Sequence, residues 1–342
     1  MFPKDFNYKM PPEWYPHCRT IMEWPVKEAI WPEPFEDILP AYADIVNKIA
    51  GFEPVTLLVN PHLYEQAASF CSHPQIDILK IAHNDSWARD NGPTFLINDQ
   101  KKIAGINWIF NGWGGKFPAE EDNRVASKLL NHFKIPSFDI SLVMEGGSFH
   151  TDGEGTLLTT EECLLNPNRN PDLTKSEIED YLRKCLGIEK IIWLKRGWNG
   201  DDTDGHIDNV ACFARPGVVI TQVCKDPADE NYLISEENLS ILRSAVDAKN
   251  RRFQIIEIQQ PPTAFYEDAR LTLSYLNFYF VNGGIILPIF NDQNTITDKS
   301  AIDILQKTFP DRKIATVNGL IVARGGGNVH CLTQQMPSYF EE

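Results

Sequence analysis

The sequence lacks the features that would assign it to several large classes of protein. No run of 18 apolar residues occurs among its 342 residues, so no transmembrane helix is predicted. The first residues do not combine a basic stretch with an apolar one, so no secretory signal is expected. No Cys-x-x-Cys pair and no GxGxxG sequence is present, and residues 110–116 match a phosphate-binding loop only in part because Phe110 replaces its first glycine. A dinucleotide-binding or P-loop fold is therefore not expected.

Basic residues are also scarce. The chain has 32 lysines and arginines against 47 aspartates and glutamates, which gives a formal net charge of −15. A field of this sign repels phosphate backbones and anionic lipid and favours a small cationic ligand, so neither nucleic acid nor a membrane is an expected partner. Seven cysteines, an odd number in a chain of this length, indicate reduced thiols and predict a cytoplasmic protein.

What the chain does contain is typical of one globular domain. Hydrophobic residues make up 42% and charged residues 23%, and no linker rich in glycine, serine or proline divides the sequence. We therefore expect a single domain over residues 1–342. Prolines that cluster between positions 11 and 34 predict an irregular N-terminal arm, residues 1–34, packed on that domain.

Hydrophobic periodicity predicts helices and strands that alternate along the chain. The expected helices are residues 35–50, 123–133, 175–186, 236–248 and 300–309. The expected strands are residues 55–59, 92–98 with 103–108, 142–147 with 155–160, 209–214 with 217–223, 277–281 with 284–288, and 319–323. This loose repetition of strand, hairpin and helix indicates an α/β fold.

Polar residues gather in four stretches where their neighbours predict buried or half-buried strand ends: 85–93, 144–148, 201–209 and 324–331. In the last stretch, the three glycines 325–327 allow close approach to a ligand and positive φ angles, and Cys331 follows them. Cys331 is therefore a candidate nucleophile. The alternative is a small core residue, which is what most free cysteines are.

His206 and Asp208 lie two residues apart, which on a strand places both side chains on one face. A histidine beside a carboxylate can serve as a general acid and base, and the alternative is a structural hydrogen-bonded pair. A calcium loop with Gly205 at its sixth position would need Gly200 and Ala211 as ligands, and neither side chain can coordinate. Zinc would need more histidines and cysteines at regular spacing. No metal and no cofactor is therefore expected.

Asp90 and Glu145 add carboxylates in the first two stretches, and each of them alone fits a turn or a cap. Together, carboxylates, a histidine and a thiol suit one chemistry, which is attack on a guanidinium carbon. Two aspartates can bind the planar fork of guanidinium N–H donors. A thiolate can attack the carbon, while a histidine protonates the departing ammonia and then activates water. The residues therefore favour hydrolysis of a guanidinium group to a ureido group and ammonia.

These residues belong to a longer series of motifs that runs from about residue 10 to residue 337. The series reads MPPEWYPH (10–17), MEWP (22–25), DSWARD (85–90), GPT (92–94), FNGWGGK (110–116), EGGSFH (145–150), DGEGTLLTTEECLLNPNRNP (152–171), GHIDN (205–209), GGGNVHC (325–331) and QQ (334–335). In this order, the series resembles the agmatine deiminases, within the broader family that includes the bacterial peptidylarginine deiminases.

The resemblance implies a fold and a set of catalytic roles. Its fold is the pentein fold, a five-bladed α/β propeller with the active site on the central axis, and its members are expected to form homodimers. Cys331 is the expected nucleophile and His206 the expected general acid and base. Glu145 is expected to pair with the histidine or with the substrate nitrogens.

The resemblance also implies a substrate site. Asp90 and Asp208 are expected to clamp the guanidinium, and Trp87 to flank the alkyl chain, for which an aromatic wall is suited. Beside the histidine the chain departs from the family, because Asp202 stands where glutamate is usual and Asp204 where asparagine is usual. We expect both to bind substrate. The additional carboxylate either tightens the binding of a cationic amine tail or reshapes the pocket for another guanidine.

The expected reaction is the hydrolysis of agmatine to N-carbamoylputrescine and ammonia through a covalent amidino intermediate on Cys331. Arginine or peptidyl-arginine is the alternative substrate, and it would require an arginine or an open groove at the far end of the pocket. An inactive guanidine-binding protein is a further alternative, which the presence of His206 and Cys331 opposes.

Overall fold

The structure, a computed structural model, describes residues 1–27, 31, 34–290 and 296–340 and has a mixed α/β fold. No helix in this part of the chain combines the length and the apolar character that a membrane crossing requires. All seven cysteines lie within it and are free thiols, as predicted.

Five sheets in the described chain share one strand pattern, in which a first strand runs antiparallel to a second and a third runs parallel to the second. Sheet by sheet, the strands are β18 (Gln334–Pro337), β1 (His17–Glu23), β2 (Val55–Val59) and an added β3 (Ile76–Lys80); β4 (Thr94–Ile97), β5 (Ile103–Ile109) and β6 (Ser137–Val143); β7 (Phe149–Thr151), β8 (Thr156–Thr160) and β9 (Lys190–Leu194); β10 (Ala211–Arg215), β11 (Val218–Val223) and β12 (Gln254–Gln259); β15 (Tyr279–Val281), β16 (Gly284–Ile289) and β17 (Lys313–Asn318). A separate ribbon pairs β13 (Phe265–Tyr266) with β14 (Ala269–Arg270).

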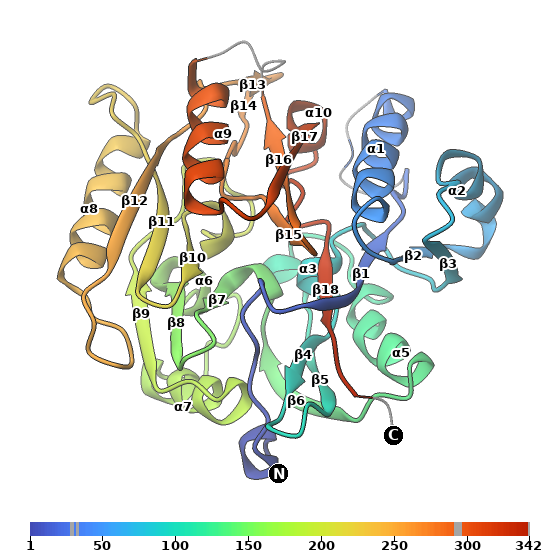
Figure 1. Cartoon of the computed structure of the whole chain (residues 1–342), viewed down its shortest axis with the longest axis horizontal. Coiled ribbons are helices and arrows are strands. Elements are labelled where there is room, and N and C mark those ends of the chain that lie inside the picture. The colour runs from blue at the N-terminus through green and yellow to red at the C-terminus, as the bar shows by residue number, and fades with distance from the viewer. Residues whose placement is uncertain (28–30, 32–33, 291–295, 341–342) are drawn as a thin grey trace.

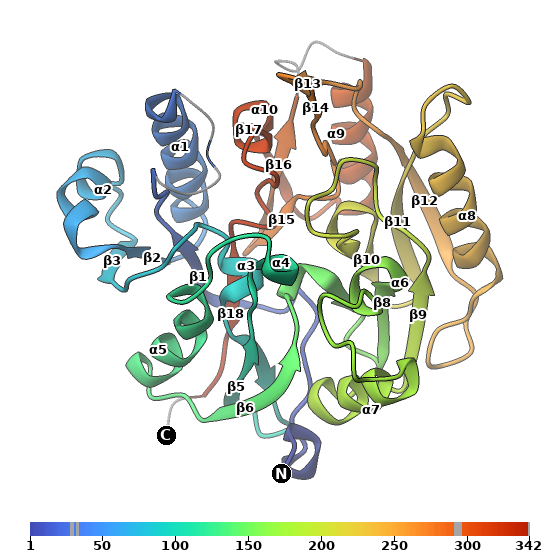
Figure 2. The same cartoon turned by 180° about the vertical axis from the view of Figure 1, so that it is seen from behind.

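The longer helices lie outside the sheets (Figure 1). The α-helices are α1 (Ile38–Ala50), α2 (Tyr64–Phe70), α3 (Ala88–Asn91), α4 (Gly112–Gly115), α5 (Val125–His132), α6 (Glu161–Leu164), α7 (Lys175–Leu186), α8 (Asn231–Ser244), α9 (Ile296–Thr308) and α10 (Gly319–Ala323). The 3₁₀ helices are η1 (Pro3–Phe6), η2 (Phe35–Asp37), η3 (Pro61–Leu63), η4 (Asp122–Arg124), η5 (Gly146–Ser148) and η6 (Ile207–Asn209). The short helices α3 and α4 lie near the centre of the molecule (Figure 2).

The predicted helices and strands form where the hydrophobic periodicity of the sequence is strong. Strand β2 is buried at every position, as expected of a strand with parallel neighbours on both sides. Helix α7 has the predicted bounds because both of its ends carry clear signals. At its start, Thr174 and Glu177 form a reciprocal capping box, and at its end Gly187 adopts a left-handed conformation with φ 70°.

Three predictions of secondary structure were wrong, wholly or in part. Residues 319–323 form helix α10 and not a strand, because the Asn318 side chain caps the Leu320 backbone N–H and so begins a helix. Strand β8 pairs with β7 and not with residues 142–147, which end β6 and enter the η5 turn. The helix predicted at 236–248 begins earlier, at Asn231, and ends at Ser244, where Ala245 turns to extended backbone.

The predicted N-terminal arm also needs correction. Residues 17–23 are strand β1, the second strand of a four-stranded sheet, and not irregular surface chain. Pairing with both β18 and β2 supplies hydrogen bonds that the proline-rich flanks could not indicate. Residues 28–30 and 32–33 of the predicted arm lie outside the described residues.

The connections between successive sheets converge on the same region. The chain passes from β3 to β4 through residues 81–93, from β6 to β7 through 144–148, and from β9 to β10 through 195–210. It passes from β12 to β15 through residues 260–278 and from β17 to β18 through 319–333. All four polar stretches of the sequence lie in these connections.

We expect the Thr174→Ala variant to lose about 1 kcal/mol of unfolding free energy, because α7 then lacks its capping box. Urea unfolding followed by circular dichroism measures this loss. Ser176→Ala, an exposed position inside the same helix, is the matched control and should change the free energy by less than about 0.5 kcal/mol. Equal losses in both variants would contradict the assigned cap.

Candidate active site

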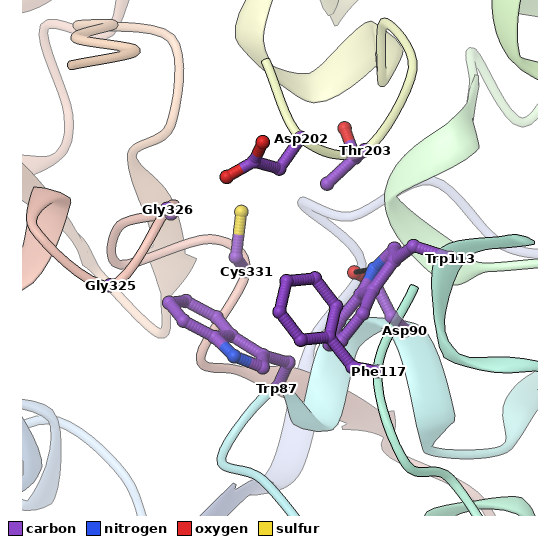
Figure 3. A pocket seen from close by; sticks show the side chains of 10 residues that line it. Trp87, Asp90, Trp113, Phe117, Asp202, Thr203, Gly325, Gly326 and Cys331 are labelled. Atoms are coloured by element: carbon purple, nitrogen blue, oxygen red, sulfur yellow. Dashed lines mark hydrogen bonds between the residues drawn. The ribbon is translucent and has the colours of Figure 1, made fainter. Parts of the chain in front are cut away.

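Cys331 opens onto a small pocket. Trp87, Asp90 and Asp202 line the pocket together with Trp113, Phe117, Thr203 and the glycines 325–327. In Figure 3 the Asp202 side chain points toward the Cys331 thiol from the opposite loop, and the aromatic rings form another wall. Four of the predicted site residues therefore lie around one small cavity: Cys331, Asp90, Trp87 and Asp202.

The Cys331 thiol is held by two side chains. Its sulfur lies 3.4 Å from Asp208 Oδ2, to which the thiol donates, and it accepts from Asn277 Nδ2 at 3.1 Å. Burial raises the pKa of Cys331 well above its usual value, and the nearby carboxylates of Asp208 and Asp90 raise it further. A Cβ atom at Gly327 would lie 3.0 Å from the Cys331 Cβ, so only glycine fits there. In the absence of a bound cation the thiol is protonated at neutral pH.

His206 lies behind this pocket with its ring fully buried. Its Nδ1 is 3.8 Å from Asp90 Oδ1 and its Nε2 is 3.9 Å from Glu145 Oε2. Burial lowers the pKa of His206, but Asp90, Cys163 and Glu145 outweigh burial and raise it well above its usual value. The ring is therefore an imidazolium at neutral pH and can donate a proton.

The predicted strand geometry of His206 and Asp208 was wrong. Gly205 has a φ of 86°, the chain turns there, and Ile207–Asn209 form the 3₁₀ helix η6. Strand β10 begins only at Ala211. The two side chains nevertheless reach the same site, because the turn brings both under the loop that carries Gly147.

Asp90, Asp208 and His206 surround one point in the site. A Cβ atom at Gly147 would lie 2.6 Å from His206 Nδ1 and 2.9 Å from Asp90 Oδ1. It would also lie 3.0 Å from Asp208 Oδ2, so a side chain at this position would fill the space between these groups. Asp90 is fixed by the Gly147 backbone N–H and by Trp113 Nε1, both at 2.9 Å. Burial raises the pKa of Asp90. Burial also acts to raise the pKa of Asp208, but His330, His206 and Cys331 together outweigh it and lower that pKa below its usual value.

Glu145 is fully buried and paired with a residue that the sequence did not single out. Its Oε1 accepts from Arg169 Nε at 2.6 Å. Although burial raises the pKa of Glu145, His206 and Arg169 outweigh it and lower the pKa below its usual value. Glu145 is thus ionised and faces the Nε2 edge of His206.

The two aspartates that depart from the family pattern have different surroundings. Asp202 lines the pocket, whereas Asp204 does not, and its carboxylate is occupied by protein groups. One Asp204 oxygen accepts from Lys116 Nζ at 2.7 Å, and the other accepts from Arg169 Nη1 at 2.6 Å and from Asn168 Nδ2 at 3.0 Å. The expectation that Asp204 binds substrate therefore has no support from its position in the structure.

Trp87 forms an aromatic wall of the pocket, and a second indole ring packs against it. Its indole ring stacks on that of Trp31, with centroids 5.3 Å apart and an interplanar angle of 17°. Gly325 lies against the same ring, because a Cβ atom there would be 2.7 Å from Trp31. The wall is rigid, which suits a pocket for a thin alkyl chain.

Sequence reasoning missed four polar residues of the site: Glu13, Arg169, Asn277 and His330. His330 stands next to Cys331, and Glu13 and Arg169 lie inside the family motifs, so their polarity beside a candidate site was a usable signal. Asn277 carried no such signal, because it is 54 positions from Cys331 and was predicted as the first residue of a strand.

One group of potential metal ligands occurs in the described chain. Ligand atoms of Glu145, Cys163 and His206 lie within 4.8 Å of one another. The Arg169 guanidinium, 2.6 Å from the Glu145 carboxylate, would repel a cation there. The same residues serve equally well to orient the His206 ring.

The site combines a buried thiol, an imidazolium and several carboxylates around one small pocket. This set of groups is typical of an enzyme with a cysteine nucleophile. The chain matches the Porphyromonas-type peptidyl-arginine deiminase family over residues 9–337. It therefore belongs to that family.

Similar proteins cover the whole chain. A protein of Legionella pneumophila (strain Paris) is 47% identical over 341 residues, 99% of this chain and 98% of that protein. The agmatine deiminase of Pseudomonas syringae pv. tomato is 41% identical over 363 residues, 99% of this chain and 98% of that protein. The solved structure of the agmatine deiminase of Enterococcus faecalis has a TM-score of 0.93 at 35% identity, and the match covers 98% of this chain and 97% of that one.

We expect Cys331 to react slowly with iodoacetamide in the ligand-free protein. At about pH 8 its rate should be at least roughly tenfold below that of free cysteine, because a raised pKa leaves little of the thiol as thiolate. Mass spectrometry of the peptide that contains Cys331 gives the rate, which should still rise above about pH 9. A plateau below about pH 8 would show a preformed thiolate and contradict a protonated resting thiol.

Proposed function

We propose that this protein is an agmatine deiminase, which hydrolyses agmatine to N-carbamoylputrescine and ammonia. The observation that carries the proposal is the pair of carboxylates, Asp90 and Asp202, that line one small pocket with the Cys331 thiol. Agmatine is cationic at both ends, so each end can meet a carboxylate. The relatives named agmatine deiminase support the same substrate.

The first half of the reaction begins when the substrate guanidinium enters between Asp90 and Asp208. Burial and the two carboxylates hold the pKa of Cys331 high, and the positive charge of the substrate offsets the carboxylates, so the thiol releases its proton to solvent when substrate is bound. The thiolate adds to the guanidinium carbon and forms a C–S bond. The His206 imidazolium gives its proton to one amino group, the C–N bond breaks, and ammonia leaves.

The second half uses the same histidine in the opposite direction. Neutral His206 accepts a proton from water, the hydroxyl adds to the amidino carbon, and the C–S bond breaks. The hydroxyl proton leaves as the ureido C=O forms, and protonation of the released thiolate restores the Cys331 thiol. Glu145 stabilises the charged form of His206 in both steps, since it is ionised and faces Nε2 at 3.9 Å. The product keeps the alkyl amine and carries a ureido group.

The pocket favours an amine over a carboxylate at the far end of the substrate. Among the described residues that line it, none is basic, so nothing there would pair with the carboxylate of free arginine. Asp202 instead offers a negative charge. Agmatine lacks the carboxylate and therefore fits this lining better than arginine does.

We also propose that the five sheets are the blades of a five-bladed α/β propeller. Their common strand pattern and the convergence of the five connections on the site support this arrangement. The homodimer and the cytoplasmic location stay predictions from the family resemblance and the composition.

We expect Cys331→Ser to lower kcat on agmatine by at least about 10⁴-fold, because serine cannot form the covalent intermediate at this position. Agmatine should still raise the melting temperature of this variant, since the carboxylates remain. Cys185→Ser, a buried thiol in α7, is the matched control and should keep full activity. Full activity in Cys331→Ser would exclude the proposed nucleophile.

Asp202→Asn should raise the KM for agmatine by roughly 10- to 100-fold, the usual effect of losing a hydrogen bond between charged groups. Asp204→Asn should change KM less than Asp202→Asn does, because the Asp204 carboxylate is bonded to Lys116 and Arg169. Steady-state ammonia release gives both values. A larger rise in KM in Asp204→Asn than in Asp202→Asn would show that Asp204, and not Asp202, binds the amine end of the substrate.

A further inference from the structure

The ring of His330, the residue before the nucleophile, lies between two carboxylates. Its Nδ1 is 2.9 Å from Asp208 Oδ2 and its Nε2 is 2.8 Å from Glu13 Oε1, and the residue is 2% exposed. A neutral imidazole has one N–H and one lone pair, so in either tautomer its lone pair would face a carboxylate oxygen. An imidazolium donates to both. Because both partners are carboxylates, the geometry favours a proton on each ring nitrogen.

Glu13 is itself held as an anion. Its Oε1 is 3.5 Å from Arg89 Nη1, and its Oε2 is 3.4 Å from His150 Nε2. Burial raises the pKa of Glu13, but His330, His150 and Arg89 outweigh burial and lower it well below its usual value. For His330, burial and Arg89 lower the pKa, and Glu13 and Asp208 raise it above its usual value.

The same network fixes the backbone that carries the nucleophile. The Arg89 backbone N–H donates to the Cys331 carbonyl at 3.2 Å, and Arg89 Nε donates to the His330 carbonyl at 3.4 Å. The Cys331 backbone N–H donates to Asn277 Oδ1 at 3.3 Å. The peptide units on either side of Cys331 are thus tied to the residues that hold Glu13.

One oxygen atom, Asp208 Oδ2, links the His330 network to the Cys331 thiol. Asp208 Oδ2 accepts from His330 Nδ1 and also from the Cys331 thiol at 3.4 Å. The titratable groups that act on Asp208 or that it acts on are His330, His206, Cys331, Asp90, Asp201 and Cys212. Among them, the two histidines are the sources of positive charge, and only His330 lies within hydrogen-bonding distance of Asp208.

We infer that His330, kept as an imidazolium by Glu13, is a positioning residue that holds Asp208 as a charged, correctly aimed partner for the Cys331 thiol and for the guanidinium of the substrate. The role in catalysis rests on the proposed function, whereas the charge on His330 does not. Neither His330 nor Glu13 belongs to the pocket lining, so both act through Asp208. Glu13, from the N-terminal segment, thereby becomes a distant part of the active site.

The charge on His330 can be tested without substrate. In protein labelled with ¹⁵N-histidine, the rings of His206 and His330 should both give doubly protonated signals at about pH 8, and one of these signals should be lost in His330→Asn. In Glu13→Gln the His330 ring should become neutral at this pH, because one of its two carboxylates is gone. A neutral His330 ring in the unmodified protein would overturn the inference, whatever the protein does with agmatine.

The positioning role is tested by the pH dependence of kcat/KM on agmatine. Removing the His330 charge makes Asp208 easier to protonate, so the acid limb should move to higher pH in both Glu13→Gln and His330→Asn. At a fixed pH on that limb, activity should fall roughly tenfold for each pH unit by which the limb moves. His330→Asn keeps an N–H near the Nδ1 position and should retain more activity than His330→Leu, which keeps neither donor nor charge.

His83→Asn is the matched control. His83 is as buried as His330, but its ring nitrogens face the carbonyls of Ile81 and Trp24 and not carboxylates. This variant should lower the melting temperature without moving the acid limb. If Glu13→Gln and His330→Asn fold, and the acid limbs of their kcat/KM profiles lie at the same pH as that of His83→Asn, His330 has a structural role only and the inference is wrong. Should His330→Asn fail to fold, the nearly isosteric Glu13→Gln decides the question alone.

Discussion

Charge buried at the centre of the molecule has to be balanced, and this constraint determines most of what surrounds Cys331. A carboxylate removed from water costs several kcal/mol unless it is paired and hydrogen-bonded. Glu145 is paired with Arg169, and Glu13 with His330 and Arg89. Asp90 has no cation within hydrogen-bonding distance, since its partners are a backbone N–H, an indole N–H and a histidine 3.8 Å away. In the proposed reaction, the guanidinium of the substrate supplies a cation in direct contact with it.

This balance of buried charge also distinguishes residues that fix the site in place from residues that line the pocket. Arg169 spans from Glu145, behind His206, to Asp204 on the loop whose other residues line the pocket. The loop that we propose to meet the far end of the substrate is therefore attached to Glu145, the carboxylate beside the proposed general acid His206. This arrangement explains how Asp204, a residue of the pocket loop, contributes without facing the pocket.

The sequence indicated the elements of the fold far better than their arrangement. Helix α7 and strand β2 were predicted from helical periodicity and an apolar run, which are local signals. The pairing of β18 with β1 could not be predicted, because the partners lie at opposite ends of the chain and neither strand encodes the other. The same limit applies to the site: its glycines made Cys331 a candidate and the family resemblance singled it out, but Asn277 meets Cys331, and Glu13 meets His330, only through tertiary packing. His206 and Asp208 were placed together for the wrong reason, since a turn and not a strand aligns them.

The contact between Glu13 and His330 has a consequence for the timing of synthesis. The two residues are 317 positions apart, so at about 5–20 residues per second the ribosome needs roughly 16–63 s to add the second after the first. During this interval Glu13 and strand β1 have neither His330 nor β18 as partners. Each nascent chain thus carries an incomplete four-stranded sheet and a Glu13 carboxylate that lacks one of its cationic partners, and it acquires Cys331, His330 and the last strand of that sheet together, within the final stretch of translation.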